Sequence, residues 1–311
     1  MGIRTDLAIE ASQLYAAKNT SAGIDGVESE ERETDGIKTT IIKITNEHGE
    51  QALGKPKGSY ITIESPDIQY SVDIYEKTCI MMSGEIKKLA NLTDKTKTLV
   101  VGLGNKKITP DALGPDVVSQ LMITNHIKEH MKEFFDDDLT SVSAIAPGVL
   151  GTTGMETSEI IKGVINQTHP DLVIAVDALA SRSLDRISTT FQLCDTGINP
   201  GSGVSNSRQG LNEETLGVKV IAIGVPTVVD AFTIASDSID MVMEDISSEF
   251  ADEEKKNDLI KKSLTENIGM LMVTPKNIDS IIEKTSKTVA NAINLALHKN
   301  LTFEKIESFV E

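Results

Sequence analysis

Two aspartates, Asp111 and Asp177, each follow an apolar segment that is typical of a buried parallel strand. Asp111 stands a short turn after the segment 97–105, and five apolar residues directly precede Asp177. Because ligands of open α/β sheets bind at the carboxyl ends of the strands, we expect both carboxylates to reach one crevice. Paired carboxylates suit general acid–base hydrolysis, since their proximity keeps one protonated while the other activates water.

Two glycines, Gly102 and Gly104, end the first of these apolar segments and are followed by Asn105. A dinucleotide-binding fingerprint would need a third glycine where Lys107 stands. A carboxylate such as Asp111 would also repel a pyrophosphate. We therefore expect Gly102, Gly104 and Asn105 to shape a tight turn that presents Asp111 above the sheet.

A short match to a metal-site pattern occurs at His126, Glu129 and His130, which have the H-x-x-E-H spacing of one zinc peptidase class. A solvated helix flank explains these residues better, because the apolar residues at 117, 118, 121 and 122 already account for the helix. The other histidines form no ligand-like cluster, and the two cysteines are too far apart for a thiolate site. We therefore expect no metal and no cofactor.

A polar, glycine-rich loop runs from 195 to 203 and is long enough to line a site. It opens with Asp-Thr-Gly, the triplet of pepsin-like aspartic proteases, but those proteins are all-β whereas this loop stands in an α/β pattern. Substrate contact or shaping of the site is expected from this loop and from the segment after Asp177, at Ser181, Arg182, Asp195, Gly201 and Gly203.

The composition excludes several classes of partner. The 311 residues carry 30 basic and 47 acidic side chains, a formal net charge of −17. A protein that binds nucleic-acid phosphates needs a basic face, and an anionic membrane surface repels an acidic chain. No apolar stretch approaches the roughly 18 residues that a membrane span needs. We expect no direct nucleic-acid partner, no membrane and a cytoplasmic location.

Strands and helices alternate from residue 97 onward, and the strands are near-continuous runs of Val, Ile and Leu. This pattern is typical of a sheet covered on both faces. We predict an α/β fold with a mostly parallel central sheet flanked by helices, formed by a catalytic domain over 95–311. One helix is expected over about 113–134 and an amphipathic one over 273–298.

We expect residues 1–94 to form an N-terminal arm and a β-containing appendage, or to be integrated with the rest in one domain. Strands are predicted at 39–45 and 59–65. The charged stretch 28–36 is predicted to be a solvated turn or a mobile arm, and the charged stretch 247–266 a surface excursion.

Five segments together strongly resemble one known family, the germination proteases of spore-forming Firmicutes. They are RTDLAIEA (4–11), VVGLGN with TPDALGP (within 100–115), APGVLGTTGMET (146–157), VDALASRSLDRISTTFQLCDTGINPGSGVSNSR (176–208) and VIAIGVPTVVDA (220–231). The resemblance runs over nearly the whole chain, and the segment 176–208 is highly specific.

The resemblance implies an endopeptidase that initiates the degradation of small acid-soluble spore proteins during spore germination. Its fold is expected to be similar to that of hydrogenase maturation proteases (phosphorylase/hydrolase-like). The two essential aspartates of these atypical aspartic peptidases match Asp111 and Asp177. The family also implies a homotetramer that is made as an inactive zymogen and acts in the cytoplasm of the forespore and the spore core.

The chain departs from the family pattern at two places. It begins close to RTDLAIEA, where mature members begin, so we expect either the mature form or a different regulation. Many relatives have histidine where this chain has Asn199, which weakens the 195–203 loop as a source of a metal ligand. A metal-dependent peptidase of the hydrogenase-maturation type, with Asp111 and Asp177 as ligands, is the alternative.

Overall fold

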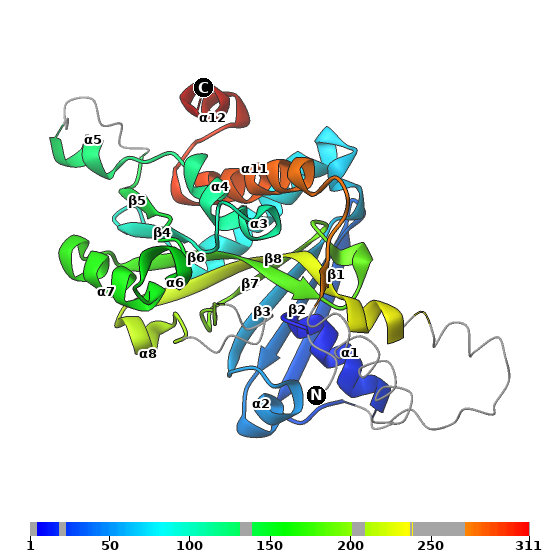
Figure 1. Ribbon diagram of the computed structural model, residues 1–311. Coiled ribbons are helices and arrows are strands. Elements are labelled where there is room, and N and C mark those ends of the chain that lie inside the picture. Colours follow the sequence, from blue (N-terminus) through cyan, green and yellow to red (C-terminus); the bar gives the residue numbers. More distant parts are fainter. Residues whose placement is uncertain are drawn as a thin grey trace, which may run out of the picture.

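The computed structural model describes residues 5–18, 23–130, 139–200, 209–236, 238 and 271–310. Within these residues one nine-stranded sheet runs through the molecule, with helices on both faces (Figure 1). The strands lie side by side in the order β1-β2-β3-β7-β8-β6-β4-β5, and β9 pairs with β8. The architecture is α/β, as the sequence predicts.

Four neighbouring strands run parallel: β5 (Val142–Ile145), β4 (Thr98–Gly102), β6 (Leu172–Ser181) and β8 (Lys219–Asp230). Helices cover both of their faces, so β4, β6 and β8 are almost entirely buried. One face packs against α3 (Val72–Ala90), α4 (Leu113–Ser119) and α11 (Ile278–Leu297). The other face packs against α7 (Thr157–Thr168) and α8 (Glu213–Leu216).

The rest of the sheet is antiparallel, so the prediction of a mostly parallel sheet is wrong: the sheet is mixed. The antiparallel pairs involve β1 (Val27–Thr34), β2 (Ile37–Ile44), β3 (Gly58–Glu64), β7 (Thr190–Cys194), β8 and β9 (Met272–Val273). β7 follows β6 after only a short 3₁₀ turn, η4 (Leu184–Arg186), and a parallel strand needs a crossover of about a dozen residues. Pairing of β3 with β7 joins the strands of residues 27–64 to the same sheet.

The charged stretch 28–36 forms most of the edge strand β1 instead of a turn or a mobile arm. The ladder between β1 and β2 uses backbone groups, so the polarity of the side chains does not prevent it. All residues of β1 after Val27 are exposed. Charged side chains on an exposed edge strand disfavour pairing with another sheet, so these charges protect the edge. The stretch 247–266 lies outside the described residues.

The helix predicted over 113–134 is two helices, α4 and α5 (Asn125–His130), and residues 131–138 lie outside the described part of the chain. The intervening backbone bonds to neighbouring elements. The amide of Met122 donates to Oδ1 of Asn294 at 3.0 Å, and the amide of Thr124 donates to the carbonyl of Val142 at 3.1 Å. Tertiary hydrogen bonds to α11 and β5 thus replace one helical turn. The predicted amphipathic helix is confirmed as α11.

The remaining elements connect or cover the sheet. They are α1 (Ala8–Lys18), α2 (Glu47–Leu53), η1 (Pro66–Gln69), η2 (Thr109–Asp111), α6 (Leu150–Thr153) and α12 (Phe303–Val310). In the part of the chain that the structure describes, no helix combines the length and apolarity needed to cross a bilayer.

The end of α11 is fixed by His298, whose ring lies between two backbone groups. Its Nδ1 accepts from the amide of Thr140 at 3.3 Å, and its Nε2 lies 3.4 Å from the carbonyl of Met122. These partners fit the neutral ring with its proton on Nε2. Burial lowers the pKa of His298 to about 4, and the bond to Met122 opposes that shift only in part.

We predict that His298 makes folding sensitive to acid. The unfolded chain binds the histidine proton near pH 6.5 and the folded chain near pH 4, so stability falls as the pH drops through that window. Between about pH 7 and 4.5, His298→Asn should lose roughly 2 kcal/mol less unfolding free energy than the wild type. Urea unfolding followed by circular dichroism measures the difference. An equal loss in both proteins would contradict the prediction.

Candidate active site

Asp177 lies inside strand β6, and the residue is only 6% exposed. The strand continues to Ser181, so the expectation that Asp177 follows the end of its strand is wrong. What ends there is the neighbouring strand β4, whose last pair with β6 is Gly102 with Val176. The amide of Leu103 then donates to the carbonyl of Val176 at 2.8 Å. Asp177 is therefore the first residue of β6 beyond the end of β4.

The carboxylate of Asp177 is turned toward the edge that β4 leaves. Val176 uses its carbonyl to bond β4, and backbone groups of alternate residues in a strand point to the same side. The amide of Ala178 therefore points to that edge as well. It donates to Oδ1 of Asp177 at 2.9 Å, which places this carboxylate oxygen beside the same edge.

Asp111 ends the 3₁₀ turn η2 and is half-buried. Its Oδ2 accepts from the amide of Asn105 at 2.8 Å. Gly104 adopts φ +113°, and a Cβ there would lie 2.0 Å from the carbonyl oxygen of Asp111. A Cβ on Gly102 would likewise lie 2.1 Å from the carbonyl oxygen of Gly114. The two glycines thus let the chain fold back onto the end of β4 and carry Asp111 with it.

The turn Leu103–Asn105 therefore contacts both segments that carry the predicted carboxylates. Leu103 bonds to the residue just before Asp177, and Asn105 bonds to the carboxylate of Asp111. The structure brings both carboxylates to the carboxyl end of β4, although they lie 66 positions apart in the sequence. Two carboxylates at one edge of the sheet suit a reaction in which one accepts a proton and the other donates one.

The other predicted site residues have structural contacts. Ser181 is buried, and its hydroxyl donates to the carbonyl of Ser183 at 2.9 Å. Oδ1 of Asp195 accepts from the amide of Ser59 at 2.8 Å, which ties the start of β3 to the end of β7. Arg182 lines a cleft beyond the end of β6. Gly201 and Gly203 lie outside the described residues.

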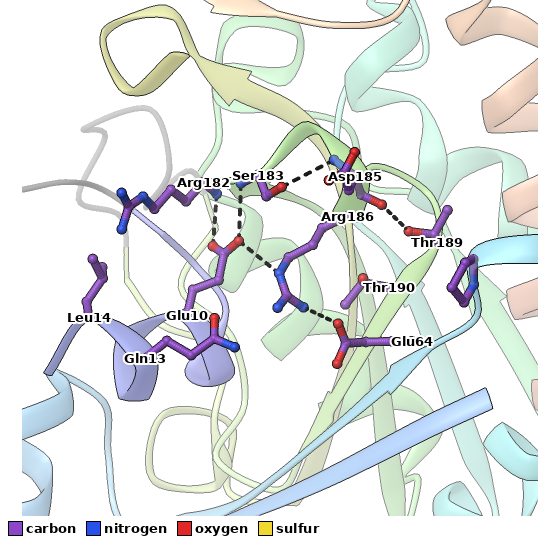
Figure 2. Close-up of a pocket in the computed structure, with 11 residues that line it drawn as sticks. Glu10, Gln13, Leu14, Glu64, Arg182, Ser183, Asp185, Arg186, Thr189 and Thr190 are labelled. Atoms are coloured by element: carbon purple, nitrogen blue, oxygen red, sulfur yellow. Dashed lines mark hydrogen bonds and ion pairs between the residues drawn. The ribbon is translucent and has the colours of Figure 1, made fainter. Parts of the chain in front are cut away.

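That cleft, of about 510 Å³, lies among α1, the end of β3 and the segment after β6 (Figure 2). Three charged residues that the sequence analysis did not single out form an ion-pair network at this cleft: Glu10, Glu64 and Arg186. The guanidinium of Arg186 bridges the other two, with 3.2 Å from Nε to Glu10 and 2.7 Å from Nη1 to Glu64. The RTDLAIEA segment contained Glu10, but nothing in the sequence relates it to an arginine 176 positions later.

Neither cysteine has the environment of a nucleophile. Burial raises the pKa of Cys79 to about 12 and raises the pKa of Cys194 as well. Each sulfur lies within hydrogen-bond distance of a backbone carbonyl, that of Thr288 for Cys79 and that of Gly197 for Cys194. A thiolate is the reactive form of cysteine, so both side chains act as buried thiols.

The H-x-x-E-H pattern lies on α5, and the side chains of Glu129 and His130 are outside the described part of the structure. Among the side chains that the structure describes, no group of three or more His, Cys, Asp or Glu could hold a metal ion. The interpretation of this pattern as a solvated helix flank therefore stays a prediction.

Comparison with known proteins relates the chain to one family. A sequence profile of the family described as germination protease matches residues 6–265 and 246–310. The germination protease of Clostridium perfringens (strain ATCC 13124) is 47% identical over 322 residues, which cover 99% of both chains. That of Caldanaerobacter subterraneus is 47% identical over 323 residues, and that of Priestia megaterium is 39% identical over 358 residues, covering 96% or more of every chain.

We predict that Gly104→Ala destabilises the protein by more than about 2 kcal/mol, because alanine disfavours the positive φ at this position and its Cβ would collide with the backbone of Asp111. Gly163→Ala is the control, since Gly163 lies in α7 with open space around it. It should stabilise by roughly 0.5–1 kcal/mol. Urea unfolding of both variants measures the contrast. A neutral Gly104→Ala would mean that the turn does not constrain Asp111.

Proposed function

The chain belongs to the germination protease family, and we propose that it is an endopeptidase that initiates degradation of small acid-soluble spore proteins during germination. The observation that carries the proposal is the convergence of Asp111 and Asp177 at the turn that ends β4. The family resemblance leads us to expect that these two residues are the essential aspartates. Family membership supports peptidase chemistry, and the paired carboxylates supply groups that can perform it.

In the proposed mechanism, one aspartate accepts a proton from water as the water attacks the scissile carbonyl carbon. The other aspartate donates a proton to the leaving amine, so the peptide bond breaks without a charged amide leaving group. The hydrogen bonds from Asn105 to Asp111 and from Ala178 to Asp177 fix both carboxylates before substrate binds. Such fixed geometry lowers the entropic cost of bringing water and acid together.

The family suggests further properties that we include in the proposal. The protein would assemble as a homotetramer, be made as an inactive zymogen in the forespore, and act in the cytoplasm of the spore core. The acidic chain is suited to partners other than DNA, because its net charge of −17 opposes binding to nucleic-acid phosphates. Its partners would then be the spore proteins themselves.

We predict that Asp111→Asn and Asp177→Asn each lower kcat on a recombinant small acid-soluble spore protein by about 1000-fold or more, because each removes half of the dyad. The double variant should be no worse than either single one. Asp116→Asn in α4 is the control and should keep wild-type activity. Mass spectrometry of the fragments measures cleavage, and circular dichroism checks folding. A double variant far slower than both singles would contradict shared activation of water.

The pH profile distinguishes the dyad from the metal-dependent alternative. Hydrolysis by two carboxyl groups needs one protonated and one ionised, so the rate should follow a bell. Its optimum should lie between about pH 6 and 7.5, because a catalytic pKa near the operating pH is most effective and the proposed reaction takes place in the near-neutral cytoplasm of the spore. Activity should survive dialysis against a chelator. A rate that still climbs beyond about pH 8, or that vanishes with the chelator and returns with a divalent metal, would favour a metal-bound hydroxide instead.

A further inference from the structure

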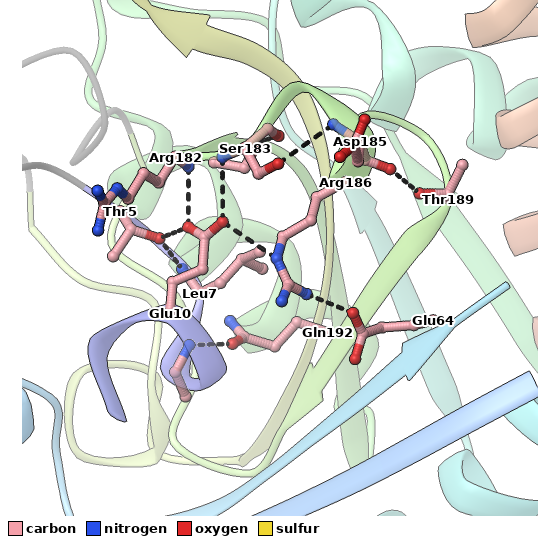
Figure 3. Close-up of polar contacts among 12 residues, drawn as sticks. Thr5, Leu7, Glu10, Glu64, Arg182, Ser183, Asp185, Arg186, Thr189 and Gln192 are labelled. Carbon is pink, nitrogen blue, oxygen red and sulfur yellow. Dashed lines mark hydrogen bonds and ion pairs between the residues drawn. The ribbon is translucent and has the colours of Figure 1, made fainter. Parts of the chain in front are cut away.

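The segment Thr5–Glu10, here called the clamp, lies against the carboxyl end of β6 (Figure 3). It is most of the RTDLAIEA motif, to which the proposed mechanism gives no role. The carboxylates of Asp6 and Glu10 accept from backbone amides at the end of β6 and just after it. The clamp, near the N-terminus, therefore contacts the strand that carries Asp177, about 170 residues later in the sequence.

The clamp occupies the edge of β6 that β4 leaves. Among the backbone hydrogen bonds of the described residues, the next one that another segment makes along this edge after Val176 is at Ala180. Its carbonyl accepts from the amide of Asp6 at 3.0 Å, and its amide donates to Oδ2 of Asp6 at 2.9 Å. Asp6 thus continues the pairing that Leu103 ends, and Asp177 lies between the two attachment points.

The opposite edge of β6 is weakened at the same place. The register of β6 and β8 shifts between Leu179 and Ala180, where Leu179 faces Pro226. A bulge interrupts the ladder there, and pairing resumes at Ala180 with Val228. The end of β6 is therefore held by a less regular ladder on this edge and by the clamp on the other edge.

Glu10 supplies the strongest part of this attachment. Its side chain is 4% exposed, and its carboxylate accepts from the amide of Arg182 at 2.8 Å and the amide of Ser183 at 3.3 Å. Nε of Arg186 lies 3.2 Å away, and the hydroxyl of Thr5 donates to the same carboxylate. A buried carboxylate with a cation and several donors is held firmly, because each bond is charge-assisted and shielded from water.

Gln192 extends the attachment to the row of the sheet that contains Asp177. Its side chain accepts from the amide of Ala8 at 2.6 Å and donates to the carbonyl of Asp6 at 3.2 Å. In the sheet, Gln192 pairs with Gly224, and Gly224 pairs with Asp177. The clamp is thus bonded both along β6 and across the sheet to the position of the aspartate.

We propose that the clamp holds the carboxyl end of β6 in register and that Glu10 is a positioning residue for Asp177. The inference rests on the proposed function, since it assumes that Asp177 takes part in the reaction. Glu10 bonds residues five and six positions after Asp177 and acts through the strand between them. Displacement of a reacting group by about 1 Å can cost roughly 100-fold in rate.

The test compares Glu10→Gln and Glu10→Ala with Glu64→Gln. A glutamine at position 10 keeps one oxygen acceptor, but its amide NH2 group replaces the other oxygen and faces donors that it cannot bond. It should therefore loosen the clamp while preserving the volume of the side chain. Glu64 is the matched control, because it lines the same cleft and bonds the same Arg186 without touching the β6 backbone in any bond that the structure gives it.

Both Glu10 variants should lower kcat on a small acid-soluble spore protein by about 10- to 100-fold, with KM changed less than about threefold. Hydrogen exchange at the amides of Arg182 and Ser183 should accelerate at least about tenfold in the same variants. Glu64→Gln should keep kcat within about threefold and leave these amides protected. Circular dichroism at the assay temperature shows which variants are folded. If Glu10→Ala does not fold, the comparison is made with Glu10→Gln alone.

Three outcomes would overturn the proposal. They are a folded Glu10→Gln variant with wild-type kcat, an equal loss of kcat in Glu64→Gln, and a loss that appears in KM alone. Each leaves the proposed function standing if the wild type cleaves and Asp177→Asn does not. A wild type that cleaves no spore protein, or an active Asp177→Asn, overturns the proposed function and with it the role of the clamp.

Discussion

The hydrogen bond from the amide of Leu103 to the carbonyl of Val176 is the last link between β4 and β6, and the site depends on that ending. Had β4 continued, its backbone would cover the edge beside Asp177. Because β4 turns away at once, the edge stays open and the chain can return along it with Asp111. Gly102 and Gly104 make that return possible, since side chains there would collide with the carbonyls of Gly114 and Asp111.

An open strand edge within a sheet has a structural cost, since it leaves backbone donors and acceptors to be satisfied in another way. This protein satisfies them with groups from distant parts of the chain. The amide of Ala178 is bonded by the carboxylate of its own neighbour, and both backbone groups of Ala180 are bonded by Asp6. The early end of β4, which leaves the edge beside Asp177 unpaired, thus also creates the need for the N-terminal segment.

The mixed sheet follows from the same connections. After β6 the chain reverses through a short turn into β7, which lies between β3 and β8 and runs opposite to both. This antiparallel half carries Gln192, whose side chain reaches the N-terminal segment. Residues far apart in sequence therefore meet at the end of β6, and local changes in the antiparallel half can reach the aspartate across one row of the sheet.

The sequence by itself determined the α/β architecture, the buried strands, the long helix α11 and the two aspartates as candidates. These follow from local patterns, because apolar runs, helical periodicity and glycines beside a carboxylate are properties of short segments. The sequence did not determine the direction of β7, the strand in the charged stretch 28–36 or the break between α4 and α5. Each of these depends on distant groups that bond the backbone and that local patterns do not record. One example is the side chain of Asn294, which accepts from the amide of Met122. Only the tertiary structure showed that β6 runs past Asp177 and that Glu10 holds its end. Those contacts join residues more than 170 positions apart, and packing of the whole chain decides which distant groups meet.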